Sequence, residues 1–322
     1  MQRRSLLSAF VIASFGHAAN AQAVWPDRPI RIIVPFPPGG PVDGGARLLA
    51  PALTEGLGQP VVIENRAGAG GSIGTEAAAR AAPDGYTLHF GSTGSLAVNQ
   101  TLIPNLSYDT RRDLTAISVV SAVPMLMVAR TGLGVNTIQD ALALARAQPN
   151  RLTYATSGPG GAPHLAGELM RQRANIQMTT IAYRGAAPAM TAIIAQEVDF
   201  TFLDPAVLMP HVRDGRMRAL AVTGPQRLAA LPDYPTLIEA GLAGVVVENW
   251  YALLAPAGTP ADRITRIHAA ISTALAKPET LRSYVDQGQR VLNLDPEKSN
   301  AFIRAEVAKW ADVVREAGMR PE

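Results

Sequence analysis

The chain has 322 residues, a formal net charge of +3 and no cysteine. Without cysteine it has neither disulfide bonds nor thiol catalysis. Removal of residues 1–23, which hold two arginines and no acidic residue, lowers the net charge from +3 to +1. The charge therefore does not indicate nucleic-acid binding, and no basic stripe with interleaved aromatic residues occurs. The remaining residues, about 300, suffice for roughly two domains.

The N-terminus has the pattern of a secretory signal peptide. A basic start, Met1–Arg4, precedes the apolar run Leu6–Phe15, and small residues of the A-x-A type follow at Ala19–Ala23. The apolar run is too short for a bilayer crossing, which takes about 20 residues. We expect export by the general secretory route rather than the twin-arginine route, with cleavage near Ala21 or Ala23.

In the first part of the mature chain, short apolar runs alternate with longer amphipathic ones. This alternation predicts layers of helices on mainly parallel sheets. Strands are predicted at 30–34, 61–64 and 86–90, each followed by a Gly/Ser-rich turn and a helical pattern. A long extended run at 115–130, interrupted by Pro124, comes next.

A second series of strands and helices begins with the helical segment 137–147, for which Thr137 is a good N-cap. Further strands are predicted at 152–155, 179–183, 198–203, 217–222 and 245–256, with helices such as 188–196 between them. The chain then ends in two helices, 260–276 and 296–318, that have no strands of their own to cover.

These last two helices must cover a sheet that forms earlier in the chain. The economical arrangement is a discontinuous first lobe, residues 24–127 and 246–322, with a second lobe, residues 128–245, inserted into it. Each lobe is expected to be a mainly parallel sheet flanked by helices. The two crossover segments between the lobes are expected to form a hinge around a ligand.

The glycine-rich stretch GAGGSIG (68–74) allows two other interpretations. It approaches the dinucleotide fingerprint G-x-G-x-x-G, but isoleucine replaces the third glycine and a loop separates the turn from the preceding strand. It also contains the G-x-S-x-G pattern of a serine hydrolase around Ser72, whose strained elbow needs a direct strand-to-helix turn. Nominal triad partners lie downstream at Asp204, His211 and His268. A solvent-facing loop is the preferred interpretation, and an exported hydrolase remains the alternative.

Nucleotide and metal chemistry have little other support in the sequence. No P-loop motif occurs, and the turn PFPPGGPVD (35–43) has no lysine for a phosphate. The histidines are scattered without the spacing of metal ligands: His17, His89, His164, His211 and His268. We predict no cofactor and no metal.

Three Gly-, Ser- or Thr-rich turns, 35–43, 91–95 and 156–164, follow predicted strands. In parallel sheets such turns lie at the carboxyl ends of the strands, where α/β folds bind ligands. A helix N-terminus favours an anion by about 0.3–1 kcal/mol, and a hydrogen bond to a charged group contributes about 1.5–3 kcal/mol. Three or four such bonds give micromolar affinity, about −8 kcal/mol. The turns therefore predict a small negatively charged ligand held between the lobes.

Several motifs follow one another along the mature chain: WPDRPIRIIVPFPPGG, GQPVVIENRAGAGGSIG, AAPDGYTL, HLAGELM, YRGAAPAM, LPDYPTLIEAG and LLAPAGTP. Together they resemble the tripartite tricarboxylate transporter receptor family, the Bug-type extracytoplasmic solute-binding proteins. The resemblance implies a two-lobed α/β periplasmic binding protein fold of the Venus-flytrap type. It also implies a ligand among di- or tricarboxylates, acidic amino acids and aromatic acids, and delivery to the membrane permease subunits of a tripartite transporter or to a sensor.

In the first lobe the resemblance implies ligand contacts from Phe36, Pro38, Gly39, Gly40, Asp43, Ser92 and Thr93. Family members commonly have Ser-Thr-Asp after the two glycines, whereas this chain has Pro41-Val42-Asp43. The replacement removes two hydroxyl donors, which favours an apolar or aromatic acid as the ligand.

In the second lobe the resemblance implies contacts from Ser157, Gly158, His164, Tyr183, Arg184, Gly185 and Asp204. His164 has the alternative of capping the helix that it starts, and Arg184 that of a solvated or interlobe charge. Asp204 precedes a proline and has the alternative of an N-cap. If its side chain faces the ligand, it rejects a second carboxylate and favours an amino or hydroxyl group.

We therefore predict a monomeric periplasmic receptor without catalysis, which closes around a small carboxylate. The exported serine hydrolase that uses Ser72 is the alternative. A receptor for an uncharged sugar is disfavoured, because three tryptophans offer little surface for stacking.

Overall fold

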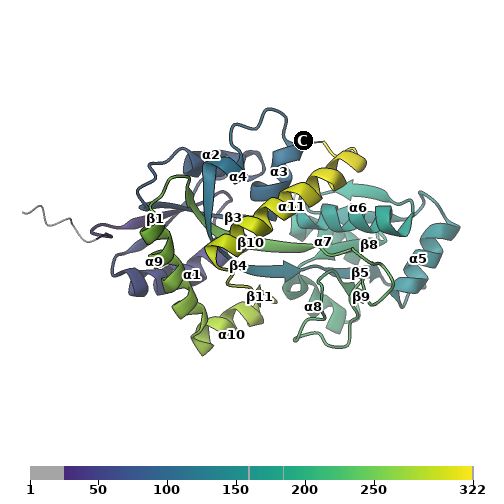
Figure 1. Cartoon of the computed structure of the whole chain (residues 1–322). Coiled ribbons are helices and arrows are strands. Elements are labelled where there is room, and N and C mark those ends of the chain that lie inside the picture. The colour runs from purple at the N-terminus through teal and green to yellow at the C-terminus, as the bar shows by residue number, and fades with distance from the viewer. Residues whose placement is uncertain (1–24, 159, 184, 321–322) are drawn as a thin grey trace, which may run out of the picture.

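The chain forms two mixed β-sheets, each flanked by helices (Figure 1). The computed structural model describes residues 25–158, 160–183 and 185–320, so the predicted signal peptide lies outside the described residues. The six-stranded sheet has the order β11-β4-β10-β3-β1-β2, and the five-stranded sheet has the order β7-β6-β8-β5-β9. The strands are β1 (Ile30–Val34), β2 (Val61–Asn65), β3 (Thr87–Ser92), β4 (Leu114–Pro124), β5 (Leu126–Arg130), β6 (Thr153–Thr156), β7 (Thr179–Ala182), β8 (Phe200–Leu203), β9 (Met217–Val222), β10 (Glu248–Pro256) and β11 (Arg290–Val291).

The helices account for most of the remaining described chain. They are α1 (Pro41–Leu57), α2 (Ser72–Ala79), α3 (Asn99–Leu102), α4 (Thr110–Asp113), α5 (Ile138–Ala147), α6 (Ala162–Ala174), α7 (Ala186–Ile194), α8 (Pro205–Arg213), α9 (Ala261–Leu275), α10 (Pro278–Asp286) and α11 (Pro296–Glu316), with a 3₁₀ turn η1 (Ala69–Gly71) and a π-helical turn η2 (Gly94–Val98). Within the described ranges, no helix combines the length and the apolarity that a membrane crossing requires.

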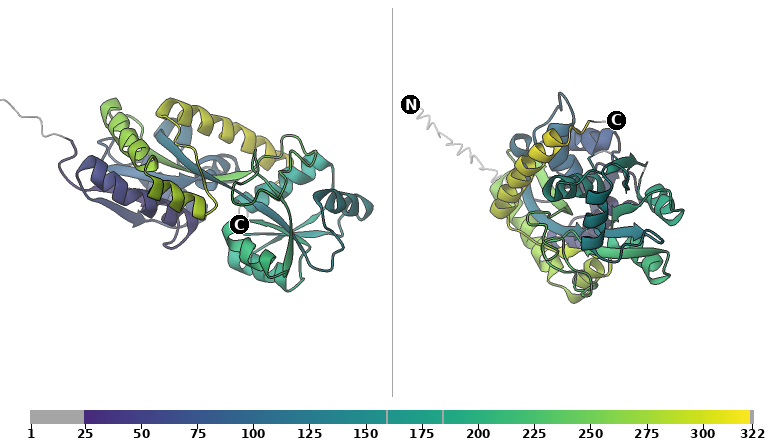
Figure 2. Two further views of the ribbon diagram at one scale, coloured as in Figure 1. Left: turned by 90° about the horizontal axis from the view of Figure 1, so that it is seen from below. Right: turned by 90° about the vertical axis from the view of Figure 1, so that its right-hand side faces the viewer.

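The predicted two-lobed architecture is confirmed. We call the six-stranded sheet and its helices the first lobe, and the five-stranded sheet and its helices the second lobe. Figure 2 shows them side by side, with both ends of the described chain in the first lobe and its middle in the second. The C-terminal helices α9 and α11 pack on β4 of the first sheet, as their lack of strands predicts.

The sheets are mixed rather than mainly parallel. Parallel pairing is confined to β2-β1-β3 in the first sheet and β7-β6-β8 in the second. β10 is antiparallel to β3 and β4, and β5 is antiparallel to β8 and β9. The reason lies in the connection between the lobes: β4 leaves the first sheet and β10 returns to it, so the two strands run side by side in opposite directions.

Two crossing segments meet at a single buried threonine. The extended run predicted at 115–130 is broken at Met125, and it continues from β4 in one sheet to β5 in the other. Thr223 holds this outgoing segment to the returning one: its Oγ1 accepts from Met125 N at 2.8 Å and donates to Val247 O at 2.5 Å. Its backbone adds bonds of 2.9 Å to the same two residues. Both crossings are thus bonded at the place where the lobes join.

Helix α11 extends from the first lobe to the second (Figure 1, yellow). It packs on β4 and η2 and also contacts α6 of the second lobe, where Gln172 Nε2 donates to Val313 O at 3.4 Å. Glu306 accepts from the indole nitrogens of Trp250 and Trp310 at 2.8 Å, which fixes α11 on β10. The last helix therefore bridges the outer side of the junction between the lobes.

Candidate functional site

A cavity of about 680 Å³ lies between the lobes. From the first lobe it is lined by Phe36, Pro37, Pro38, Gly39, Gly40, Pro41, Val42, Gly70, Ser92, Gly94, Asn99 and Asn249. The second lobe contributes Ser157, Gly158, Gly160, Gly161, Ala162, Pro163, Gly185, Ala186, Leu203 and Asp204, and Met125 lies at the crossing. The three predicted turns therefore meet at one cavity.

The structure brings most of the sequence-predicted residues to this cavity. Those that line it are Phe36, Pro38, Gly39, Gly40, Ser92, Ser157, Gly158, Gly185 and Asp204. Asp43, Thr93, His164 and Tyr183 are not among the lining residues, and Arg184 lies outside the described residues.

Four helices begin at the cavity: α1 from the first lobe, and α6, α7 and α8 from the second. Their N-cap residues are Gly40, Gly161, Gly185 and Asp204, and no side chain caps any of the four. A helix start leaves backbone N–H groups without partners and carries a partial positive charge. The ends of both lobes therefore favour an anion in the cavity, and none of its lining residues in the described part of the chain is basic.

Asp43 shapes the first-lobe turn from beneath. It is 2% exposed, and its carboxylate accepts from Gly39 N, Arg47 Nε and Asn65 Nδ2 at 2.8–2.9 Å. Asn65 Nδ2 also donates to Phe36 O at 3.0 Å. The hydrogen bond from Arg47 is the main reason why the pKa of Asp43 falls to about 2. The Gly39 N–H, predicted as a ligand donor, is thus already bonded, and Asp43 holds the turn in place.

Thr93 belongs to the junction between the lobes. Its hydroxyl donates to Glu248 O at 3.2 Å and accepts from Trp250 N at 2.9 Å, so it joins the end of β3 to the start of β10. Ser92, immediately before it, lines the cavity. The predicted Ser-Thr pair thus divides into one residue at the cavity and one that fixes the returning strand.

His164 supports the second-lobe turn. Its Nδ1 accepts from Gly160 N at 3.4 Å, and its Nε2 lies 3.9 Å from Glu168 Oε1. Burial lowers the pKa of His164, which keeps the ring neutral and able to accept. His164 therefore holds the turn in front of α6 and, contrary to the alternative given above, does not cap that helix.

Glu168, which the sequence analysis did not single out, anchors the region behind this turn. Its carboxylate accepts from Arg171 Nη1 at 2.7 and 2.9 Å, from Thr180 Oγ1 at 3.1 Å and from the Tyr154 hydroxyl. Glu168 is 5% exposed, so its charge depends on these partners. In the sequence, only the position of Glu168 in the helix that follows a glycine-rich turn indicates this role.

Asp204 lines the cavity, and its side chain does not cap helix α8. It stands at the N-cap position of α8, but its carboxylate makes no capping bond; the backbone carbonyl accepts from Val207 N and Leu208 N. Burial raises the pKa of Asp204 to about 6. Tyr251, which is fully buried, lies near enough for the charge of Asp204 to add to the rise in its own pKa.

The hydrolase alternative lacks its geometry. Residues 66–71 separate β2 from Ser72, which is the first residue of α2, so no direct strand-to-helix elbow forms. The Ser72 hydroxyl donates to Ala69 O at 2.8 Å. Of the nominal partners, His211 lies on α8 in the second lobe, and His268 lies on α9 with Ser272 at 3.4 Å.

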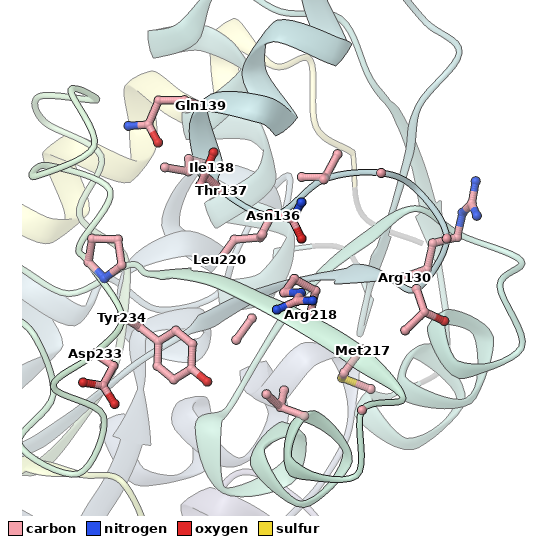
Figure 3. Close-up of a pocket in the computed structure, with 18 residues that line it drawn as sticks. Arg130, Asn136, Thr137, Ile138, Gln139, Met217, Arg218, Leu220, Asp233 and Tyr234 are labelled. Atoms are coloured by element: carbon pink, nitrogen blue, oxygen red, sulfur yellow. The ribbon is translucent and has the colours of Figure 1, made fainter.

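A second hollow, of about 820 Å³, lies in the second lobe around the edge strand β9 (Figure 3). Helix α5 begins there, but its start is closed by a capping box: Thr137 Oγ1 accepts from Asp140 N, and Asp140 accepts from Thr137 N. Arg130 at its rim donates to Asp199 at 2.8 Å. The helix start and the Arg130 guanidinium at this hollow are thus bonded within the protein.

Comparisons with known proteins agree with this fold. The family model described as tripartite tricarboxylate transporter family receptor matches residues 45–319. Protein BugT of Bordetella pertussis is 37% identical over 99% of both chains. An R. palustris protein solved with adipate is 32% identical with a TM-score of 0.81, over 92% of this chain and 100% of that one. MatC of Rhodopseudomonas palustris with bound malate is 31% identical with a TM-score of 0.75, over 90% and 100%. The chain belongs to the tripartite tricarboxylate transporter receptor family.

Proposed function

We propose that this member of a family of periplasmic binding proteins captures one small carboxylate in the cavity between its lobes and presents it to membrane permease subunits or a sensor. The observation that carries the proposal is the convergence of four helix N-termini without side-chain caps on one cavity. Relatives solved with adipate and malate support the same ligand class.

The proposed mechanism is closure of the lobes. Residues 24–127 with 246–322 move as one unit and residues 128–245 as the other, and the crossings at Met125 and Thr223 act as the hinge. The first-lobe turn, held by Asp43, receives the carboxylate, and the start of α6 closes on it. Each N–H bond to the charged ligand contributes about 1.5–3 kcal/mol.

The proposal includes export and release after cleavage near Ala21 or Ala23, a monomeric state and the absence of catalysis. The bond from the Ser72 hydroxyl to Ala69 O supports the last point, because a nucleophile needs a general base in that place.

The test is a thermal-shift and calorimetry screen of the mature chain from Val24 onward, with each acid paired with its uncharged amide. The matched pairs are hexanoate with hexanamide, adipate with adipamide, and benzoate with benzamide. An acid at a hundred times its Kd adds about 2.7 kcal/mol of stability, and its amide adds none. Equal shifts for acid and amide, shifts for sugars alone, or ester turnover that Ser72→Ala abolishes would overturn the proposal.

A further inference from the structure

Asp204 places a negatively charged side chain at the cavity, which the capture of a carboxylate alone does not require. Among the lining residues that the structure describes, it is the one ionisable side chain. The rest of the lining consists of glycine, proline and small polar residues, with an apolar part formed by Phe36, Val42, Met125 and Leu203. The described wall therefore combines backbone N–H donors for an anion with a single carboxylate.

The Asp204 carboxylate is not needed to hold α8. It makes no capping bond, and α8 starts with Pro205, which has no N–H to satisfy. On β10, Tyr251 lies near Asp204, and its hydroxyl accepts from Asn249 Nδ2 at 3.0 Å. A partly desolvated carboxylate without such bonds is unfavourable unless a partner compensates its charge. The raised pKa of Asp204 agrees with this cost.

Among the described residues none forms a hydrogen bond or ion pair with the Asp204 carboxylate, and the ligand can supply such a partner. One carboxylate of a ligand satisfies the helix N-termini, whereas a second carboxylate near Asp204 meets a like charge, which is repulsive in a cavity of low dielectric constant. A protonated amino group in that place forms a charge-assisted hydrogen bond with Asp204 instead. The apolar part of the wall suits methylene groups between the two ends.

Resting on the proposed function, we propose that the cavity selects a carboxylate that also carries a protonated amino group, with the ammonium facing Asp204 at the start of α8 and the carboxylate facing the N-termini of α1, α6 and α7. Asp204 is then the residue that discriminates amino acids from dicarboxylates of equal length.

The experiment uses calorimetry at pH 7.5 on the mature chain with two series of matched length. One contains 6-aminohexanoate, 6-hydroxyhexanoate, hexanoate and adipate, and the other contains 4-aminobutyrate, butyrate and succinate. The amino acid is expected to bind about ten- to a hundredfold more tightly than the dicarboxylate of the same length. The variant Asp204→Asn keeps the shape of the side chain without its charge. Its affinity for the amino acid should fall about tenfold or more, and its affinity for the dicarboxylate should rise.

The outcomes separate the two proposals. Dicarboxylates that bind best to the wild type, or a preference that Asp204→Asn leaves unchanged, overturn the role of Asp204 while carboxylate capture stands. A flat response to every acid overturns both. If Asp204→Asn does not fold, the ratio between 6-aminohexanoate and adipate in the wild-type chain decides, since it needs no variant.

Discussion

The cavity between the lobes and the hollow around β9 have similar volumes, about 680 and 820 Å³, and helices begin at both. They differ in what bonds those helix starts. At the β9 hollow the Thr137–Asp140 capping box bonds the N–H groups of Thr137 and Asp140 at the start of α5. At the cavity, α1, α6, α7 and α8 begin without any side-chain cap.

A capped helix start stabilises the fold, whereas an uncapped helix start can bind a ligand. A cap contributes about 1 kcal/mol to the fold and leaves fewer donors for a ligand. A glycine at the N-cap gives up part of that stability and keeps the N–H groups accessible. The size of a hollow therefore says less about binding than the state of the backbone groups around it.

The largest expected effect comes from converting the start of α6 to the capped state with Gly161→Asp. Gly161 has φ −72° and ψ 159°, and a Cβ there meets no atom closer than 3.5 Å. The new carboxylate can accept from the His164 N–H, since Pro163 has none, and it repels the ligand by about 4 kcal/mol for charges 4 Å apart at an effective dielectric constant of 20. We expect at least a hundredfold loss of carboxylate affinity in calorimetry, with no loss of thermal stability.

Gly161→Ala is the matched control, because it adds the Cβ without the charge. It should keep affinity within about threefold of the wild type. If Gly161→Asp binds carboxylates as well as Gly161→Ala does, the uncapped helix start is not where the ligand binds.

Most of the fold was predictable because it depends on local patterns. The buried run IRIIV gives β1 at the predicted residues, and Thr137 caps α5 as predicted. Family membership confirms the resemblance that the motifs indicated. The pairing direction of β10 and the short β11 were not predictable in this way, because both depend on where β4 lies in the sheet.

The sequence was sufficient to predict which turns form the site, but not which of their side chains face the cavity. Glycine-rich turns identify the cavity, since backbone N–H groups need no particular side chain. The positions of Asp43 and Thr93 could not be deduced, because a polar side chain beside a ligand turn can face the ligand or hold the turn. Asn99 and Asn249, which also line the cavity, stand in segments that read as helix and strand.

Asp43→Asn tests whether the acid in the first turn of α1 serves the fold, as the acid of α5 does. The pKa of Asp43 is lowered from 3.8 to about 2, so its ionised form stabilises the folded state above pH 4, and this contribution is lost as the pH falls through about 2. We expect the variant to lose about 2 kcal/mol at pH 7 in urea unfolding. The difference from the wild type should shrink between pH 4 and 2; a constant difference would contradict this role.

Changing the pH tests the one described charge in the cavity. Because burial raises the pKa of Asp204 to about 6, acid below that value neutralises it and removes the partner of a ligand ammonium. Binding of 6-aminohexanoate should weaken about tenfold from pH 7.5 to 5. The other titratable groups to consider are Tyr251 on β10, His164 on α6, and His211 and Arg213 at the far end of α8. The variant Asp204→Asn separates their contribution, because any pH dependence of affinity that remains in this variant comes from these other groups.

The smallest effect is expected at the β9 hollow. Thr137→Ala removes the bond from Asp140 N to the Thr137 hydroxyl and should lower the stability of the fold by about 1 kcal/mol. Carboxylate affinity should stay within experimental error, since the residues at the start of α5 are not among those that line the cavity. A change in affinity would mean that the two hollows are coupled through β5 and β9, and the contrast between capped and uncapped helix starts would no longer separate stability from binding.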